Sequence, residues 1–482
     1  MKKWLLLLLL LLIPMGTASA EVLAYPVPEG TPTEQAMFQV TADGQEVGVY
    51  SDYNMEFYEV SFAYFHFTPD TAVEVKVRPD FPFQEVEVLP KKPRAITVAE
   101  DGEITLTLTE PGEKLSFVFD GDYQAYALHL FTSPIDPELE KKKDAFGVRY
   151  FGPGYHDLSD QEVVLGTGMT LVVAPGAVLN APVVVYNASN VIIEGGGVIM
   201  MDKKSAVNPD YGNIVVTLNH AKNVILRDVI VCSHRPQNWT THVYFSSDVT
   251  IDNYKVFSPQ YASTDAIDIT NSQRVRVTNS FLRSCDDCVT IKGLADAATP
   301  KDAPPNEDIH VSATQLWNDC NNAMVIGEES MAAYYDNITF RDIDVLYSYD
   351  DRDNHERLDE RAVMSIVTLH GTDIRNILWE DIRVNNCQRL VCFNFKDSFW
   401  FGTIQGNQEF PGGAENITLR NITCESSNKS SIANEILICG WSEDKLFSDI
   451  TFDNVVVDGV RLTSMLNPYF KINEHIRNIR FQ

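Results

Sequence analysis

Three aspartates near the middle of the chain have the types and spacing for acid and base catalysis. Asp265 lies in the segment Ser263–Ile269, and the adjacent pair Asp286 and Asp287 begins 21 positions later. Crowded carboxylates repel one another, so at least one should keep its proton at a higher pH than a free Asp. A protonated carboxyl beside an ionised carboxylate is the pair that cleavage of a glycosidic bond needs.

Two other uses of this segment remain open on the residues alone. The aspartates could form a polar ladder or a calcium site. Cys285 and Cys288 form a C-x-x-C pair, which could indicate redox or zinc chemistry, but Asp-Asp separates them and no second pair has the right spacing. We therefore favour acid and base chemistry and predict no metal and no cofactor.

The elements that must position these aspartates belong to an internal repeat. Its unit is a polar residue followed by alternating apolar positions, and the clearest copies begin at Asn223, Asn337, Asn376, Asn416 and Asp449. Weaker copies begin at Asn190, Asp248, Arg274, Asp308 and Asn478. Coils of a β-solenoid bury their inward residues against the coils above and below, and they repeat at roughly 25 to 40 residues with loops of variable length. We predict a right-handed parallel β-helix over residues 145–482.

In such a helix the 21 positions from Asp265 to Asp286 are close to one coil, so stacking should bring Asp265 beside the pair. Adjacent residues of a regular strand point to opposite sides. Both Asp286 and Asp287 can face one cleft only if the backbone turns or bulges there.

The N-terminal part of the chain predicts export and a separate domain. Residues 1–20 combine Lys2-Lys3, a short Leu-rich run and Ala18-Ser19-Ala20, which is typical of a cleaved secretory signal peptide. We therefore expect secretion and no membrane span. Residues 21–144 show short alternating strands broken by Pro, Gly and Asp, which predict an antiparallel β-sandwich followed by a linker.

The net charge of the chain disfavours some classes of binding partner and substrate. A formal charge of -29 and a pI of about 4.6 argue against nucleic acid and anionic membrane surfaces. The same negative charge also argues against a highly charged uronate polymer as the substrate.

The aspartate segments also carry a family resemblance. The motif N-T-D-G-x-D-I of family 28 glycoside hydrolases (polygalacturonases) is similar to Thr264-Asp265-Ala266-Ile267-Asp268-Ile269, and their D-D-C-V-A-I-K segment is similar to Asp286-Asp287-Cys288-Val289-Thr290-Ile291-Lys292. The resemblance implies that Asp286 is the general acid, that Asp265 and Asp287 activate water, and that the anomeric configuration is inverted.

Two departures from that family shift the expected substrate. Asn322 stands where the G-H-G motif has its His, and the R-x-K motif that grips a uronate is matched only by Arg361-Ala362-Val363, without the Lys. Family 49 (dextranases and isopullulanases) resembles this chain more closely in having a β-sandwich before the β-helix. We therefore favour a family 49-like architecture and a neutral polysaccharide or oligosaccharide, such as an α-glucan.

Further side chains are candidates for binding the glycan, because they fall within about one coil of the aspartates; for each, a structural role is the alternative. They are Trp239, His242, Asp268, Lys292, Trp317, Asn322, Glu328 and Glu329.

Three functions stay open besides the neutral-glycan hydrolase. They are a polygalacturonase-type pectin hydrolase, a β-helical polysaccharide lyase and a non-catalytic glycan-binding solenoid. A lyase would need calcium, an acidic substrate and a basic residue to abstract a proton, and no Arg or Lys cluster clearly supplies the base. A binding solenoid would not need all three aspartates.

Overall fold

The computed structural model describes residues 21–55, 58–203, 214–234, 238–261, 263–349, 360–369, 371–396, 398–399, 402–403, 410, 412–425 and 435–482. The predicted signal peptide, residues 1–20, lies outside the described residues. Within these ranges, no helix has the length and apolar character needed to cross a membrane.

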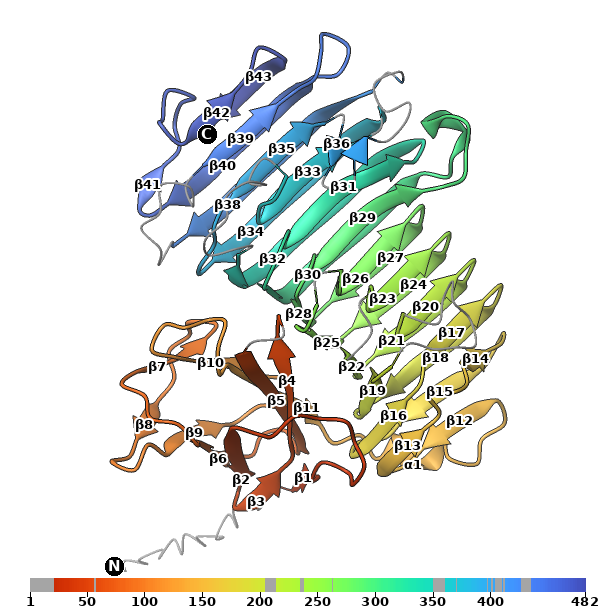
Figure 1. Cartoon of the computed structure of the whole chain (residues 1–482), viewed down its shortest axis with the longest axis vertical. Helices are drawn as coiled ribbons and strands as arrows, with labels where there is room; N and C mark the ends of the chain where they lie inside the picture. The colour runs from red at the N-terminus through yellow and green to blue at the C-terminus, as the bar shows by residue number, and fades with distance from the viewer. Residues whose placement is uncertain are drawn as a thin grey trace, which may run out of the picture.

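The N-terminal part is a β-sandwich of two sheets (Figure 1). The alternating segment Val73–Pro79 forms β6, whose apolar residues are buried and whose charged residues face outward. One sheet contains β3 (Gln45–Val47), β2 (Phe38–Ala42), β6, β9 (Ile104–Leu108) and β8 (Ile96–Val98). The other contains β1 (Val22–Ala24), β5 (Tyr58–Phe67), β11 (Leu128–Pro134), β10 (Lys114–Phe119) and β7 (Val86–Leu89), with β4 (Val49–Asn54) beside β5. The expected linker is partly structured, because β11 runs to Pro134 and a single helical turn, α1 (Glu138–Lys141), follows.

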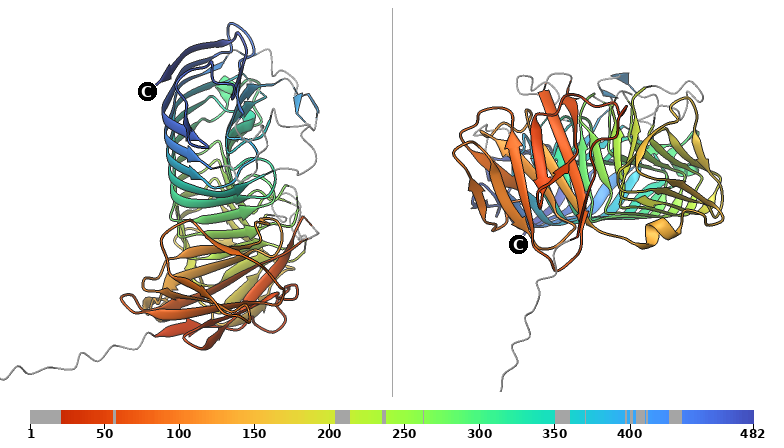
Figure 2. Two further views of the ribbon diagram at one scale, coloured as in Figure 1. Left: turned by 90° about the vertical axis from the view of Figure 1, so that its left-hand side faces the viewer. Right: turned by 90° about the horizontal axis from the view of Figure 1, so that it is seen from below.

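From Val148 onward the chain winds into a right-handed parallel β-helix (Figures 1 and 2). Its first face, in the described residues, is an 11-stranded sheet. The strands are β14 (Val163–Leu165), β17 (Val183–Tyr186), β20 (Val216–Asn219), β23 (Thr241–Tyr244), β26 (Ile267–Thr270), β29 (Val289–Leu294), β31 (Met324–Met331), β33 (Met364–Thr368), β35 (Val391–Phe395), β39 (Ile436–Cys439) and β42 (Phe470–Ile472).

Over the part of the chain that the structure describes, the other faces join into a 19-stranded sheet, parallel except at β41. Its early strands are β12 (Val148–Phe151), β13 (Gly154–Asp157), β15 (Thr170–Val173), β16 (Ala177–Asn180), β18 (Ser189–Gly195), β19 (Val198–Met201), β21 (Lys222–Arg227), β22 (Ile230–Ser233), β24 (Ser247–Asp252), β25 (Lys255–Ser258), β27 (Gln273–Thr278) and β28 (Phe281–Ser284). Later strands are β30 (Asn306–Asn318), β32 (Tyr334–Ser348), β34 (Asp373–Val384), β38 (Gly413–Cys424), β40 (Phe447–Val457), β41 (Val460–Arg461) and β43 (Ile476–Phe481). A short hairpin, β36 (Ser398–Phe399) and β37 (Gly402–Thr403), and a 3-10 turn, η1 (Pro300–Asp302), lie between strands.

The repeat predicted from sequence has a backbone cause. The residue that opens each of its ten copies has a φ between 52° and 59°. Asn and Asp adopt this left-handed conformation more readily than other side chains with a Cβ, and all but one of these residues are Asn or Asp. Their side chains also bond from coil to coil, as when Asn223 Nδ2 donates to Asn190 Oδ1 at 2.7 Å. The polar slot of the repeat is therefore the bend at which each coil turns a corner.

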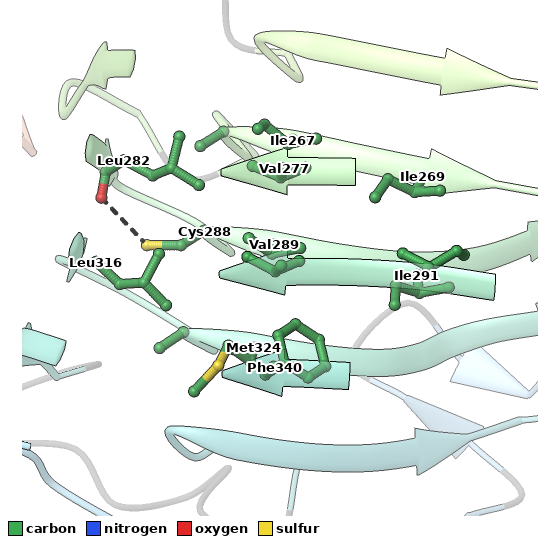
Figure 3. Close-up of a cluster of buried hydrophobic side chains, with 14 of the residues drawn as sticks. Ile267, Ile269, Val277, Leu282, Cys288, Val289, Ile291, Leu316, Met324 and Phe340 are labelled. Atoms are coloured by element: carbon green, nitrogen blue, oxygen red, sulfur yellow. Dashed lines mark hydrogen bonds between the residues drawn. The ribbon is translucent and has the colours of Figure 1, made fainter. Parts of the chain in front are cut away.

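The interior of the helix is a continuous apolar core. Figure 3 shows its rows near the aspartates, with Ile267, Val289 and Met324 from successive coils stacked on one another. Cys288 points into this core, and its Sγ lies 3.6 Å from the main-chain oxygen of Leu282 (Figure 3). A zinc or redox role for the C-x-x-C pair does not fit a thiol packed among aliphatic side chains.

The sandwich packs against the side of the β-helix (Figure 1). One buried cluster joins Tyr50, Phe62 and Phe131 of the sandwich to outward-facing helix residues that extend from Val178 to Tyr349. The contact therefore spans several coils, including those that carry the aspartates.

Candidate active site

Asp286 and Asp287 lie in the turn between β28 and β29. The hydroxyl of Ser284 lies 2.8 Å from the main-chain oxygen of Asp286 and 3.0 Å from that of Asp287. Because the two residues lie in a turn and not in a regular strand, their side chains need not point to opposite sides, as predicted from the sequence.

Asp265 lies in the equivalent turn of the preceding coil. The N–H of Ala266 donates to the main-chain oxygen of Asp287 at 2.8 Å, and Ile267 pairs with Val289. One carboxylate oxygen from each of Asp265, Asp286 and Asp287 lies within 4.8 Å of the other two. The structure thus gathers the predicted catalytic aspartates into one group, which we call the carboxylate cluster.

Asp286 is the partly exposed member of this cluster, whereas Asp265 and Asp287 are each only 2% exposed. Its Oδ2 accepts a hydrogen bond from the N–H of Ser263 at 2.7 Å. Its Oδ1 accepts from Asn321 Nδ2 at 2.7 Å and from the N–H of Asp287 at 2.9 Å. Asn321 was not singled out in the sequence, although it adjoins Asn322.

Asp287 is held by the next coil. The N–H of Asn322 donates to its Oδ1 at 2.7 Å. Burial and the neighbouring charge of Asp286 raise the pKa of Asp287 to about 8, although Lys292 and Asn322 favour its ionised form. Burial also raises the pKa of Asp265 well above its usual range, with the charge of Asp268 as the next cause. The cluster therefore keeps protons at neutral pH.

Lys292 connects the cluster to other acidic side chains. Its Nζ lies 3.3 Å from Asp265 Oδ2, 3.5 Å from Asp268 Oδ1 and 3.7 Å from Glu329 Oε2. Burial lowers the pKa of Lys292, but these carboxylates outweigh it and hold the pKa well above its usual value. Asp268 is also fully buried; burial raises its pKa to about 6, and Thr290 Oγ1 donates to it at 2.7 Å.

Glu328 and Asn322 also lie next to Asp287. Asn322 Nδ2 lies 3.5 Å from Glu328 Oε1. Burial and the charge of Asp287 raise the pKa of Glu328 well above its usual range. Glu329, by contrast, keeps a side chain that is 23% exposed.

Trp239 and His242 lie next to Lys292, which in turn contacts the carboxylate cluster. The Lys292 Nζ stands 4.4 Å above the Trp239 ring, and the Trp239 and His242 rings are 5.0 Å apart. Burial, together with Lys292, lowers the pKa of His242 to about 3, so this ring is neutral. Its Nε2 lies 3.1 Å from Thr270 Oγ1.

The structure adds Tyr244 to this aromatic group, with its ring 4.9 Å from that of His242. Val243 points into the core, so His242 and Tyr244 on either side of it point outward. That alternation was visible in the sequence, but which face of the helix carries the aspartates was not.

Trp317 corrects one sequence prediction. This side chain is fully buried between the domains, where its ring lies 5.7 Å from that of Tyr123 of the sandwich. Its Nε1 donates to Asp319 Oδ1 at 3.1 Å. It belongs to the 19-stranded sheet and is enclosed by protein, so the prediction that Trp317 binds glycan hydroxyls is wrong.

The carboxylate oxygens also lie close enough to hold a cation. Lys292 already supplies a positive charge beside Asp265 and Asp268. The absence of a catalytic metal stays a prediction, for which resistance to EDTA is the test.

Comparisons with known proteins agree on the family and the fold. The model of glycosyl hydrolases family 28 matches residues 179–472. A polygalacturonase of Persea americana is 28% identical over 117 residues, which are 22% of this chain and 24% of that protein. The match thus spans about a quarter of that relative's length.

Two solved structures share the fold. Dex49A from Penicillium minioluteum has a TM-score of 0.70 at 14% identity, over 95% of this chain and 96% of its own. A hyperthermoactive exopolygalacturonase from Thermotoga maritima has a TM-score of 0.50 at 16% identity, over 72% of this chain and 86% of its own. The first of these likenesses extends over the sandwich as well as the helix.

Proposed function

Because this chain belongs to the glycosyl hydrolases of family 28 and is a glycoside hydrolase, we propose that it cleaves a neutral polysaccharide outside the cell, with inversion of the anomeric carbon. Asp265, Asp286 and Asp287 carry the acid and base chemistry. The observation that supports a neutral substrate is the density of acidic groups around the cluster.

Among the described residues, six acidic side chains lie in or next to the carboxylate cluster: Asp265, Asp268, Asp286, Asp287, Glu328 and Glu329. Lys292 already pairs with three of them. The raised pKa of Asp265, Asp287 and Glu328 indicates that negative charge in this space is already costly. A uronate would add another negative charge, whereas neutral hydroxyls can donate hydrogen bonds to these carboxylates.

In the proposed mechanism the cluster carries a proton that reaches the glycosidic oxygen through Asp286. Asp286 fits this role because it is partly exposed and lies within 4.8 Å of the two buried aspartates. One of Asp265 and Asp287 supplies the proton that passes to Asp286, and the other, ionised, accepts the proton of the attacking water, so the cluster ends each turnover with the proton that it started with.

The lyase alternative needs a neutral basic side chain at the substrate. Lys292 does not fit that role, because its carboxylate partners hold its pKa well above the usual value and keep it charged.

A pectin hydrolase is the second candidate, because a polygalacturonase is among the relatives. Arg361, the nearest match to the family's cationic motif, lies buried next to Ala362, whose N–H donates to Asn322 Oδ1 at 2.9 Å. A pectin hydrolase that binds its substrate in the manner of the family would need the Arg361 guanidinium to contact the uronate carboxylate.

A reducing-sugar screen separates these functions. Wild type and Asp286→Asn are assayed on dextran, pullulan, other neutral α- and β-glycans and polygalacturonate, each with and without EDTA. We expect release from a neutral glycan that EDTA does not affect and that the variant loses. Release from polygalacturonate alone would replace the neutral substrate by pectin, and unsaturated products that need calcium would establish a lyase.

A further inference from the structure

A fully buried ion pair lies immediately before both segments that hold the carboxylate cluster. Arg283 Nε lies 2.9 Å from Asp319 Oδ2, and neither side chain has any exposed surface. A second hydrogen bond runs from the Arg283 guanidinium to Asp319 Oδ1 at 3.1 Å. Arg283 precedes Asp286 by three positions, and Asp319 precedes Asn321, which donates to Asp286, by two.

The main chain couples the same two segments. The N–H of Asp319 donates to the oxygen of Ser284 at 2.9 Å. Asn318 Nδ2 donates to the main-chain oxygen of Asp286 at 2.5 Å. A shift of the ion pair would therefore move the turn that carries Asp286 relative to the segment that carries Asn321 and Asn322.

Two side chains of the sandwich complete this ion pair. Asn54, the last residue of β4, donates through Nδ2 to Asp319 Oδ1 at 3.1 Å and to the main-chain oxygen of Gln124 at 3.1 Å. His129 of β11 lies with Nε2 2.9 Å from an Arg283 nitrogen, and its Nδ1 lies 2.7 Å from Ser116 Oγ. Burial and the charge of Arg283 lower the pKa of His129 well below its usual value, so Nε2 is an acceptor and Nδ1–H donates to Ser116.

From this geometry we propose that the β-sandwich is a positioning element of the active site. Asn54 and His129 fix the orientation of the Arg283–Asp319 pair, and the pair sets the distance between the turn of Asp286–Asp287 and the segment of Asn321–Asn322. This role goes beyond covering the outer face of the helix. The inference rests on the proposed catalytic roles of Asp286 and Asp287.

The energetics favour such a role. A buried ion pair is held in place only when its remaining donors and acceptors are satisfied, because each unpaired group in a protein interior is costly. The reaction rate in turn falls steeply when catalytic groups are displaced, on the order of 100-fold for about 1 Å. A small displacement of the Arg283–Asp319 pair should therefore lower kcat before it measurably lowers the free energy of global unfolding.

The test compares Asn54→Ala with Lys114→Met in the full chain. Lys114 also crosses the domain interface: its Nζ donates to Asn279 Oδ1 at 3.0 Å and to the main-chain oxygen of Gly112 at 3.2 Å, and neither partner lies in the catalytic turns. Asn54→Ala leaves both Arg283 bonds on Asp319 and should fold. Hydrogen exchange by mass spectrometry is measured on peptides covering 283–289 and 318–324, together with kcat and KM on the glycan that the wild type hydrolyses best.

We expect Asn54→Ala to speed exchange in both peptides and to lower kcat about tenfold with KM nearly unchanged, while Lys114→Met leaves both readouts at the wild-type level. His129→Gln, which keeps an acceptor for Arg283, should retain more turnover than His129→Leu. Unchanged exchange and kcat in Asn54→Ala would overturn the proposal, as would equal effects of Lys114→Met. If the wild type hydrolyses no tested glycan but Asn54→Ala still exchanges faster in both peptides, the positioning contact stands and the proposed function is rejected.

Discussion

The main-chain N–H of Asn322 donates a 2.7 Å hydrogen bond to Oδ1 of Asp287, 35 positions earlier in the chain. The Asn322 side chain also reaches the following coil, where its Oδ1 accepts from Ser365 Oγ at 2.5 Å. Asn322, the residue expected in place of the His of the family 28 motif, therefore binds a carboxylate through its backbone and connects neighbouring coils through its side-chain amide.

Asp286→Asn should abolish most activity without unfolding the protein. General acid catalysis contributes on the order of 10²- to 10⁴-fold to a rate, and the amide has no proton of suitable acidity to deliver. The measurement is kcat/KM beside a thermal melt, with the exposed Asp296→Asn as the matched control. Near-wild-type turnover in Asp286→Asn would remove this residue from the mechanism.

Asp287→Asn should stabilise the protein at alkaline pH. The folded-state pKa of Asp287 is raised to about 8 from an ordinary 3.8, so the folded state binds its proton more tightly than the unfolded state does. Stability from this group is present below pH 4 and declines as the pH rises from about 4 to about 8. The Tm of the variant should therefore exceed that of the wild type at pH 8 and approach it near pH 4. A constant difference across this range would contradict the raised pKa.

Lys292→Met should move the alkaline limb of the activity profile to higher pH. The Lys292 charge lowers the pKa of Asp265, Asp268, Asp287 and Glu328, so its removal raises these pKa values further. We expect a wild-type limb near pH 8, where Asp287 loses the proton that the cluster passes to Asp286, and an upward shift in the variant. The profile of kcat/KM against pH checks this; a downward shift would show that the limb does not report a carboxyl proton.

Tyr244→Ala should weaken substrate binding more than it slows chemistry. Tyr244 and Lys292 occupy one outward row through Thr270, so Tyr244 lies two coils, or about 10 Å, from Lys292 along the sheet. Loss of a ring that stacks on a sugar should raise KM about tenfold, which corresponds to about 1.4 kcal/mol. The control is Tyr334→Ala, on the 19-stranded sheet. A fall in kcat with constant KM would place Tyr244 in the support of the cluster instead.

The product formed first should have the inverted anomeric configuration. Inverting enzymes usually hold their two carboxyl groups about 6.5 to 9.5 Å apart, whereas oxygens of this cluster lie within 4.8 Å of one another. The expectation therefore derives from the family resemblance and not from the spacing. Proton NMR of the first turnovers identifies the anomer, and a retained configuration would make one of the buried aspartates a nucleophile.

Much of the fold follows from local sequence. The polar slot of the repeat marks a bend because Asn and Asp tolerate a positive φ, and the apolar positions between bends must face one core. Such features recur with the coil and involve residues near one another in the chain. The approach of Asp265 to Asp286 and Asp287 follows from the same period, since one coil separates them.

The contacts between the domains were decided only by the tertiary structure. Trp317 has the residue type of a sugar-binding side chain, yet it lies against Tyr123 and donates to Asp319. The partners Asn54 and Asp319 are 265 positions apart, and no period relates them. Such contacts arise from the matching of two whole surfaces, so their physical cause is absent from either segment alone. For the same reason, the sequence identified the aspartates, but only the folded chain placed three carboxylates around Lys292 and the sandwich behind Asp286.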